Sequence, residues 1–152
     1  IKTERRCLAM DKIPFSTTGA ETNFDKQWAF EVAYFTRYTG AVLKELGDFL
    51  NVRDYVEARL LAAQMKQKAE YEKTLQPDFR TSNCFVKARK IFNRFLDECV
   101  NFAELLRVTT IQEETGCEEL EDKPEQVRNS ADRLNLLREL LIDELRIQGW
   151  YY

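Results

Sequence analysis

The sequence predicts an all-α protein, built as an up-down-up-down four-helix bundle with an irregular N-terminal arm. The 152-residue chain contains only five Gly and three Pro, while residues that favour helices, such as Leu, Ala, Glu and Lys, are plentiful. Apolar residues recur at steps of three and four along separate segments, and each segment must bury one face. A chain of this length removes roughly 70% of its unfolded surface from water, which is enough for one core.

The first predicted segments are the arm, residues 1–22, and a helix over about Phe24–Leu50 with Asn23 as its N-cap. Pro14, Gly19 and a run of Ser and Thr interrupt the periodicity of the arm. The helix carries an apolar stripe of Trp28, Val32, Phe35, Thr39, Val42, Leu46 and Phe49. Beside it, Phe30, Tyr34 and Tyr38 stand at i, i+4 and i+8. This second face is either part of a wide core or a surface for another subunit or an apolar ligand.

A second helix is predicted to follow a turn at Gly47–Arg53 and to end near Leu75, before Gln76-Pro77-Asp78. Asn51, with Asp54 three residues later, is the predicted cap. The turn is favoured over one continuous helix through this region. The expected buried face consists of Tyr55, Val56, Leu60, Ala63 and Leu75.

The third helix begins after Ser82, and its buried stripe is Phe85, Ala88, Phe92, Phe95, Cys99, Phe102 and Leu106. Residues 108–123 are rich in acids and predict a long loop. Asp122, Pro124 and Glu125 signal the start of a fourth helix, which ends at Gly149. Its buried face is Val127, Ala131, Leu134, Leu137, Leu141 and Leu145. The predicted organisation is therefore an arm (1–22), a bundle (23–149) and an aromatic tail (150–152).

The composition excludes several classes of chemistry. The chain has no His, so Ser-His-Asp and Cys-His nucleophile systems, His-ligated haem and Cys/His zinc sites each lack a required residue. The four cysteines form no C-x-x-C pair, and the acidic stretch lacks the ligand spacing of a Ca²⁺ loop. We therefore expect no catalytic residues, no cofactor and no metal.

Charge and hydropathy limit the partners. A net charge of −3 does not favour nucleic-acid binding, which a strongly basic face would drive. Charged residues interrupt each apolar run, so no membrane span is predicted. The chain begins at Ile1 rather than Met, which is typical of a protein whose leading segment is removed by processing or lies outside the sequence.

The cysteines leave two interpretations open. In an antiparallel bundle the starts of the first and third helices share one end, so Cys7 can reach Cys84, and the long loop can bring Cys117 to Cys99. Alternatively, Cys99 is an ordinary core residue in its apolar stripe and the others are unpaired thiols.

The predicted contact residues are basic and aromatic. Lys87, Lys90 and Arg94 begin the third helix, at the corner where basic residues also end the second. Such a basic pole, opposite the acidic loop, steers a charged partner. Trp150 and Tyr151 follow the last helix, and exposed aromatics of this kind anchor interfaces.

The segment Asp48-Phe49-Leu50-Asn51-Val52-Arg53-Asp54-Tyr55-Val56 is similar to the apolar-Asp-x-Lys-Asp-Trp segment of the Q-type extrinsic proteins of photosystem II. Tyr55 stands where that family has Trp. Residues 90–92, 96–97 and 102–103 resemble the family's third helix, and an arm before a four-helix bundle has the same order.

This resemblance implies a non-enzymatic subunit in the thylakoid lumen, which supports oxygen evolution and is bound to a membrane-embedded complex by charge and by its arm. An oxidising lumen also permits disulfides. We accordingly predict an accessory subunit that docks on a larger protein complex. The alternative is a helical module that binds an apolar small ligand, or an interaction domain of a non-photosynthetic assembly.

Overall fold

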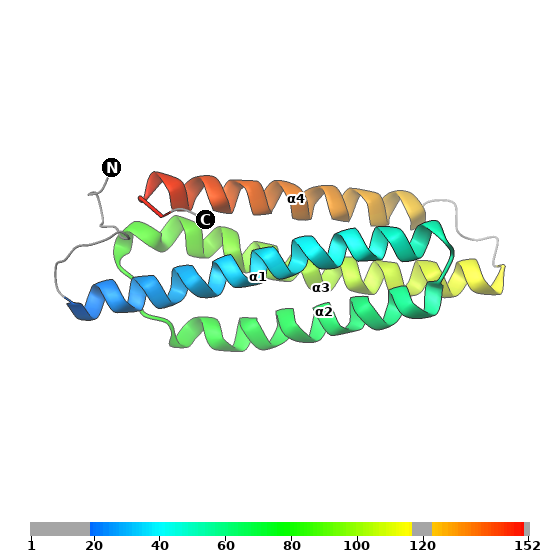
Figure 1. The fold of residues 1–152 in the computed structure, drawn as a ribbon, viewed down its shortest axis with the longest axis horizontal. Helices are drawn as coiled ribbons and strands as arrows, with labels where there is room; N and C mark the ends of the chain where they lie inside the picture. Colours follow the sequence, from blue (N-terminus) through cyan, green and yellow to red (C-terminus); the bar gives the residue numbers. More distant parts are fainter. Residues whose placement is uncertain (1–18, 117–122, 151–152) are drawn as a thin grey trace.

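The computed structural model describes residues 19–116 and 123–150, and in this part of the chain the only regular structure is helical. The long helices are α1 (Gly19–Asn51), α2 (Tyr55–Leu75), α3 (Val86–Thr115) and α4 (Lys123–Ile147). Two short 3₁₀ helices, η1 (Gln76–Asp78) and η2 (Asn83–Phe85), connect α2 to α3. The four long helices run up-down-up-down side by side (Figure 1). The prediction of an all-α helical bundle is confirmed.

The predicted turn between the first two helices is present, but its cap is a different residue. Asp54, rather than Asn51, is the N-cap of α2, and its carboxylate accepts a hydrogen bond of 3.3 Å from the Glu57 backbone N–H. Arg53 adopts a positive φ of 61°, a conformation that a helix does not contain. The chain therefore leaves α1 at Asn51 and begins α2 only after the reversal.

Two other helix boundaries differ from the prediction. Helix α1 starts at Gly19, so Asn23 lies inside the helix instead of capping it. Helix α3 continues through Thr115 and ends at Gly116, whose φ of 70° gives a left-handed C-cap. The loop predicted from Val108 is wrong over 108–115, because Thr109 and Thr110 are buried and extend the packed face of α3. The rest of the arm (1–18) and of the acidic stretch (117–122) lies outside the described residues.

The core is built around aromatic side chains that separate α1 from α3. The Trp28 ring lies 5.4 Å from Phe85 and 6.0 Å from Phe92, measured between ring centroids. The Phe35 ring lies 6.1 Å from Phe92 and 6.2 Å from Phe95, nearly perpendicular to both. Such edge-to-face contacts favour aromatic pairs beyond simple burial. The apolar stripes predicted for the first and third helices form this core.

The face predicted for the second helix is wrong. Val56 and Leu60 are 52% and 54% exposed, and the buried side instead consists of Ala58, Ala62, Met65, Ala69 and Glu72. These residues also recur at steps of four and three, but alanine is weakly apolar and a glutamate interrupts the pattern. Because alanine side chains are small, α2 packs closely along α3, and this packing outweighs the burial of larger residues on the opposite face.

The four helices do not have equivalent neighbours. Helix α3 packs extensively against both α2 and α4, whereas α1 packs against α2 and meets α4 at only a few positions. One meeting point is Gly40, where a Cβ would lie 3.2 Å from an Arg138 guanidinium nitrogen. Because glycine has no side chain, Arg138 of α4 can lie against α1 at this position. Towards the start of α1 the two helices diverge (Figure 1).

The aromatic core generates a stability prediction with an internal control. Replacement Phe92→Ala should lower the free energy of unfolding by about 3–5 kcal/mol, because it leaves a cavity beside Trp28 and Phe35. Phe30, which is 66% exposed, is the matched control, and Phe30→Ala should change stability by less than about 0.5 kcal/mol. Urea unfolding measured by circular dichroism gives both values. Equal losses would contradict the assignment of the core.

Candidate binding groove

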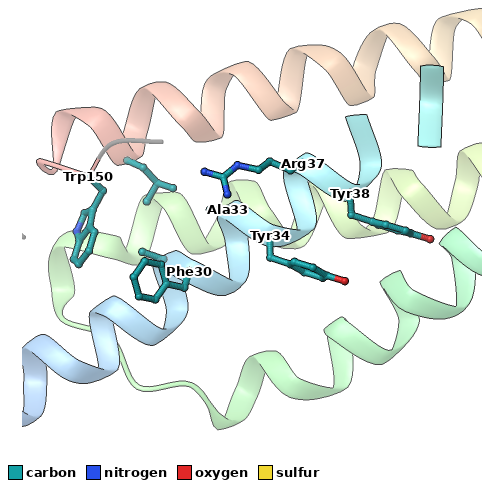
Figure 2. Close-up of a pocket in the computed structure, with 8 residues that line it drawn as sticks. Phe30, Ala33, Tyr34, Arg37, Tyr38 and Trp150 are labelled. Carbon is teal, nitrogen blue, oxygen red and sulfur yellow. The ribbon is translucent and has the colours of Figure 1, made fainter. Parts of the chain in front are cut away.

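The divergence of α1 from α4 leaves a groove with a cavity volume of about 440 Å³. We call it the aromatic groove. It is lined by Ala29, Phe30, Ala33, Tyr34, Arg37 and Tyr38 of α1, by Leu145 of α4, and by Trp150. Figure 2 shows Trp150 at one end of the groove and the α1 side chains along its length.

The sequence left open whether the second aromatic face of α1 is part of a wide core or an exposed surface, and the exposure of its residues decides between the two. Phe30 and Tyr34 are 66% and 58% exposed, so the wide-core interpretation is wrong for these two residues. Tyr38 instead packs against the core, and its ring lies 4.7 Å from the Lys68 ammonium. Burial raises the pKa of Tyr38 above its usual value. The face is therefore divided between groove and core.

The end wall is formed by Trp150. Gly149 has a φ of 92°, which turns the chain back after α4, and the Trp150 backbone N–H donates a hydrogen bond of 2.8 Å to the Leu145 carbonyl. The indole lies 6.1 Å from the Phe85 ring. Trp150 is thus half-buried and built into the fold, rather than a free anchor beyond the helix end. Tyr151 lies outside the described residues.

Arg37 is the one charged side chain among the described residues that line the groove. In Figure 2 its side chain extends from α1 in the direction of Trp150, and Arg37 already takes part in another interaction within the protein. A guanidinium has five N–H donors, so it can hold more than one partner. The groove therefore combines exposed aromatic surface with one positive charge.

The predicted basic residues lie at the same end of the molecule but outside the groove. Lys87 is 75% exposed, and its ammonium is 3.7 Å from the Glu144 carboxylate of α4. Lys90 and Arg94 are exposed on the next turns of α3. The structure thus gathers these residues and Trp150 at one pole, although none of the three basic residues lines the aromatic groove.

The structure tests part of the prediction about the cysteines. Cys99 is a free, buried thiol, and burial raises its pKa. The predicted pairing of Cys99 with Cys117 is therefore wrong, because the side chain of Cys99 in α3 is buried in the core of the bundle as a free thiol. Cys84 is disulfide-bonded, and its partner is not among the described residues. Cys7 and Cys117 also lie outside them, so the pairing of Cys7 with Cys84 stays a prediction.

A second depression, of about 340 Å³, lies between α1 and α2 and contains Glu31 and Glu72. Glu72 is only 4% exposed, and the Gln76 side-chain amide donates a hydrogen bond of 3.3 Å to its carboxylate. Burial, together with a hydrogen bond and repulsion from Glu31, raises the pKa of Glu72 to about 8. The Glu72 carboxyl therefore keeps its proton at neutral pH. Sequence analysis did not predict this pair, because Glu31 and Glu72 belong to different helices and no local pattern joins them.

Comparisons with known proteins add no identification. No protein-family model, curated protein or solved structure matches the chain. Within residues 19–116 and 123–150, no helix is long and apolar enough to cross a membrane. The same residues contain no group of three or more His, Cys, Asp or Glu side chains that could hold a metal ion. Functional inference therefore depends on the geometry of the groove and its surroundings.

The raised pKa of Glu72 predicts how stability depends on pH. The pKa of Glu72 is about 8 in the folded protein, against an ordinary value of 4.5. Within this window the folded protein binds more protons than the unfolded chain, so its stability falls as pH rises, by at most about 1.4 kcal/mol per pH unit. Glu72→Gln, which keeps a neutral hydrogen-bonding group, should flatten this loss and be more stable than the wild type above pH 8.

Thermal unfolding followed from pH 5 to pH 9, a range that spans the Glu72 pKa of about 8, measures this difference. Glu70→Gln is the matched control, because Glu70 is exposed on the same helix. It should reproduce the wild-type dependence. A pH profile that is the same in all three proteins would rule out the raised pKa of Glu72.

Proposed function

We propose that the protein is a non-enzymatic accessory subunit that docks on a larger protein complex through the aromatic groove. The observation that carries this proposal is the exposure of Phe30 and Tyr34, at 66% and 58%, in a groove that the bundle's own helices leave uncovered. Apolar patches rimmed by polar residues mark interaction sites, and aromatic residues dominate the energetics of such contacts.

The chemistry of the groove supports binding rather than catalysis. Its described titratable residues are Tyr34, Arg37 and Tyr38, which do not form a nucleophile with an adjacent base. The free thiol of Cys99 is buried and does not line the groove. The carboxyl pair Glu31 and Glu72 does not line the groove and lies in the depression between α1 and α2.

The basic pole supplies a second contribution to docking. Lys90 and Arg94 are exposed on α3, near the end of α4 from which Trp150 extends. Exposed charge accelerates association with an oppositely charged partner and makes it sensitive to salt. We expect the groove to provide affinity and the basic pole to provide orientation.

The resemblance to Q-type extrinsic proteins makes photosystem II the first complex to test. The segment that carries it, 48–56, forms the turn between α1 and α2, and the bundle architecture is the one that the resemblance implies. On this proposal the protein resides in the thylakoid lumen and supports oxygen evolution at the lumenal side of the complex.

A second candidate function is a module that holds an apolar small molecule. The volume of the aromatic groove, about 440 Å³, lies within the range of roughly 300–1,000 Å³ that is common for ligand pockets. Co-purification of a chromophore or lipid with the protein, and its loss on Tyr34→Ala, would favour this function over docking.

The docking proposal is tested by fractionation of the source cells. We expect the protein to sediment with a membrane-embedded complex in low salt and to be released by high salt without detergent, because charge contributes to binding. Release from photosynthetic membranes would support photosystem II as the partner. Recovery in the soluble fraction at low salt would contradict docking and leave the small-ligand function.

Variants separate the two contact regions in the same assay. Phe30→Ala/Tyr34→Ala should abolish sedimentation with the complex, whereas Leu60→Ala/Tyr71→Ala, which removes an exposed apolar pair from α2, should not. Lys90→Glu/Arg94→Glu should lower the salt concentration needed for release. Lys44→Glu/Arg128→Glu makes the same change in net charge at other exposed positions and serves as its control.

A further inference from the structure

Cys84 forms a disulfide bond, and the other cysteines of the chain limit its partner to two residues. The chain contains four cysteines. Cys99 is excluded because it is a free thiol in the core. The partner of Cys84 is therefore Cys7 or Cys117, both of which lie outside the described residues. Their positions along the chain decide between them.

The length of α3 excludes Cys117. Cys84 stands two residues before Val86, the first residue of α3, and Cys117 stands two residues after Thr115, the last. The 30 residues of this helix span about 44 Å at a rise of about 1.5 Å per residue. Even if the two residues at each end ran straight back along the helix, at about 3.8 Å each, Cys84 and Cys117 would stay about 28 Å apart. A disulfide requires Cα atoms within about 7 Å of each other, so the partner that remains is Cys7.

The Cys84 end of this bond is held in place by α1. The Asp25 carboxylate is buried and accepts a hydrogen bond of 2.8 Å from the Ser82 backbone N–H and one of 2.9 Å from the Ser82 hydroxyl. The Ser82 oxygen lies 3.0 Å from the Cys84 sulfur, and the next residue, Phe85, is fully buried. A segment that is bonded to Cys84 is therefore attached to a fixed point of the bundle.

This fixed point lies at the basic pole. Cys84 stands three residues before Lys87 and six before Lys90, at the end of the bundle where α3 begins and α4 ends (Figure 1). Its neighbour Phe85 contacts Trp150, with the ring centroids 6.1 Å apart. The disulfide thus joins the N-terminal arm to the region that the proposed function uses for orientation.

The arm carries positive charge beside its cysteine. Arg5 and Arg6 directly precede Cys7 in the sequence. A disulfide brings the two bonded Cα atoms within about 7 Å, and each further residue adds at most about 3.8 Å. The Cα atoms of both arginines therefore stay within roughly 15 Å of the Cys84 Cα atom by covalent geometry alone. Without the bond, the only covalent link between these arginines and Cys84 is the long intervening chain.

We propose that Cys7 and Cys84 form a redox-controlled disulfide that adds Arg5 and Arg6 to the basic pole, so that the oxidised protein binds the acidic surface of its partner complex more tightly than the reduced protein. Reduction takes two electrons and two protons. A dithiol reductant supplies both: it closes to its own disulfide through a mixed disulfide, and each cysteine is left as a thiol. This inference rests on the proposed docking function and specifies how docking is regulated.

Peptide mapping tests the bond. The purified full chain is alkylated in denaturant without reductant and cut with trypsin, which cleaves after Lys and Arg. Each cysteine then lies in its own peptide, and those of Cys7 and Cys84 are 7–12 and 81–87. We expect mass spectrometry to find these two peptides linked until reductant is added. A link from 81–87 to the peptide of Cys117, or alkylation of Cys84 without reductant, would overturn the assignment.

Sedimentation with the native complex tests the control of docking. After treatment with dithiothreitol, the affinity for the complex should fall by about two- to thirtyfold, as expected for the loss of two exposed charge contacts, and the protein should be released at lower salt. Cys7→Ser should behave like the reduced wild type and should not respond to dithiothreitol. The matched control Cys117→Ser, which leaves the bond intact, should respond like the wild type.

Charge variants separate the bond from the arginines that it positions. Arg5→Gln/Arg6→Gln keeps the cysteines, yet its oxidised form should bind as weakly as the reduced wild type. Lys2→Gln/Lys12→Gln makes the same change in net charge five residues from Cys7 on either side and should weaken binding less. Circular dichroism verifies that the bundle is intact in each protein.

The outcomes distinguish this inference from the proposed function. If the bond is present but dithiothreitol leaves the affinity of the wild type unchanged, or if Arg5→Gln/Arg6→Gln binds like the oxidised wild type, redox control is wrong and the docking function stands. An equal loss of affinity in Cys7→Ser on addition of dithiothreitol would mean that the reductant acts on the complex, which also overturns redox control. Failure of the oxidised and reduced protein alike to sediment with any complex would remove the proposed function and this inference together.

Discussion

Aromatic packing between α1 and α3 controls the spacing of this bundle. Trp28 and Phe35 of α1 contact Phe85, Phe92 and Phe95 through their rings, at centroid separations from 5.4 to 6.2 Å. Rings of this size hold α1 away from α3, whereas alanines let α2 pack closely along α3. As a result α1 meets α4 at only a few positions, one of them Gly40, and diverges from it towards the start of α1 (Figure 1). The aromatic groove is thus a consequence of how the core is filled.

A buried polar chain fixes α1 against the connection between α2 and α3. The Trp28 indole N–H donates a hydrogen bond of 2.9 Å to the Gln76 side-chain carbonyl, and the Gln76 amide in turn donates to Glu72. Arg89 of α3 donates to the Gln76 backbone carbonyl. The side chains of Trp28, Gln76 and Glu72 thereby each have a partner, which is the condition under which a buried polar network stabilises one arrangement. The carboxyl pair of Glu31 and Glu72 extends the chain to the surface.

The same features connect stability to binding. Helix α1 presents Trp28 and Phe35 to the core and Phe30 and Tyr34 to solvent, so one helix carries both core aromatic residues and the candidate contact surface. The rigid backbone on which the exposed rings stand lowers the entropy lost when a partner binds. Trp150 completes the groove because its indole is fixed against Phe85. Binding at this site therefore depends on core residues that a partner does not touch.

Strong apolar stripes, such as the Phe-rich one in α3, predicted which helices exist and which of their faces are buried, because side chains three and four residues apart share a face. Weak stripes were misjudged: the alanine face of α2 was overlooked, and Thr109 and Thr110 were assigned to a loop although they are buried in α3. Burial of Thr109 and Thr110 overrides the low helix preference of threonine. The alanines of α2 are buried because their small side chains permit close packing against a neighbouring helix. Phe30 and Tyr34 were recognised as a second face, but their periodicity fits burial and exposure equally well.

The chain's local pattern of polar and apolar residues thus determines the helices, the lack of His-dependent chemistry and the residues that compete for the core. The positions of the helices relative to one another depend instead on contacts between residues far apart in the sequence. The gap between α1 and α4, the contact of Arg138 with Gly40 and the proximity of Glu31 to Glu72 each join residues far apart in the sequence. Such distances depend on the volumes of side chains supplied by other helices, and local periodicity contains no information about them.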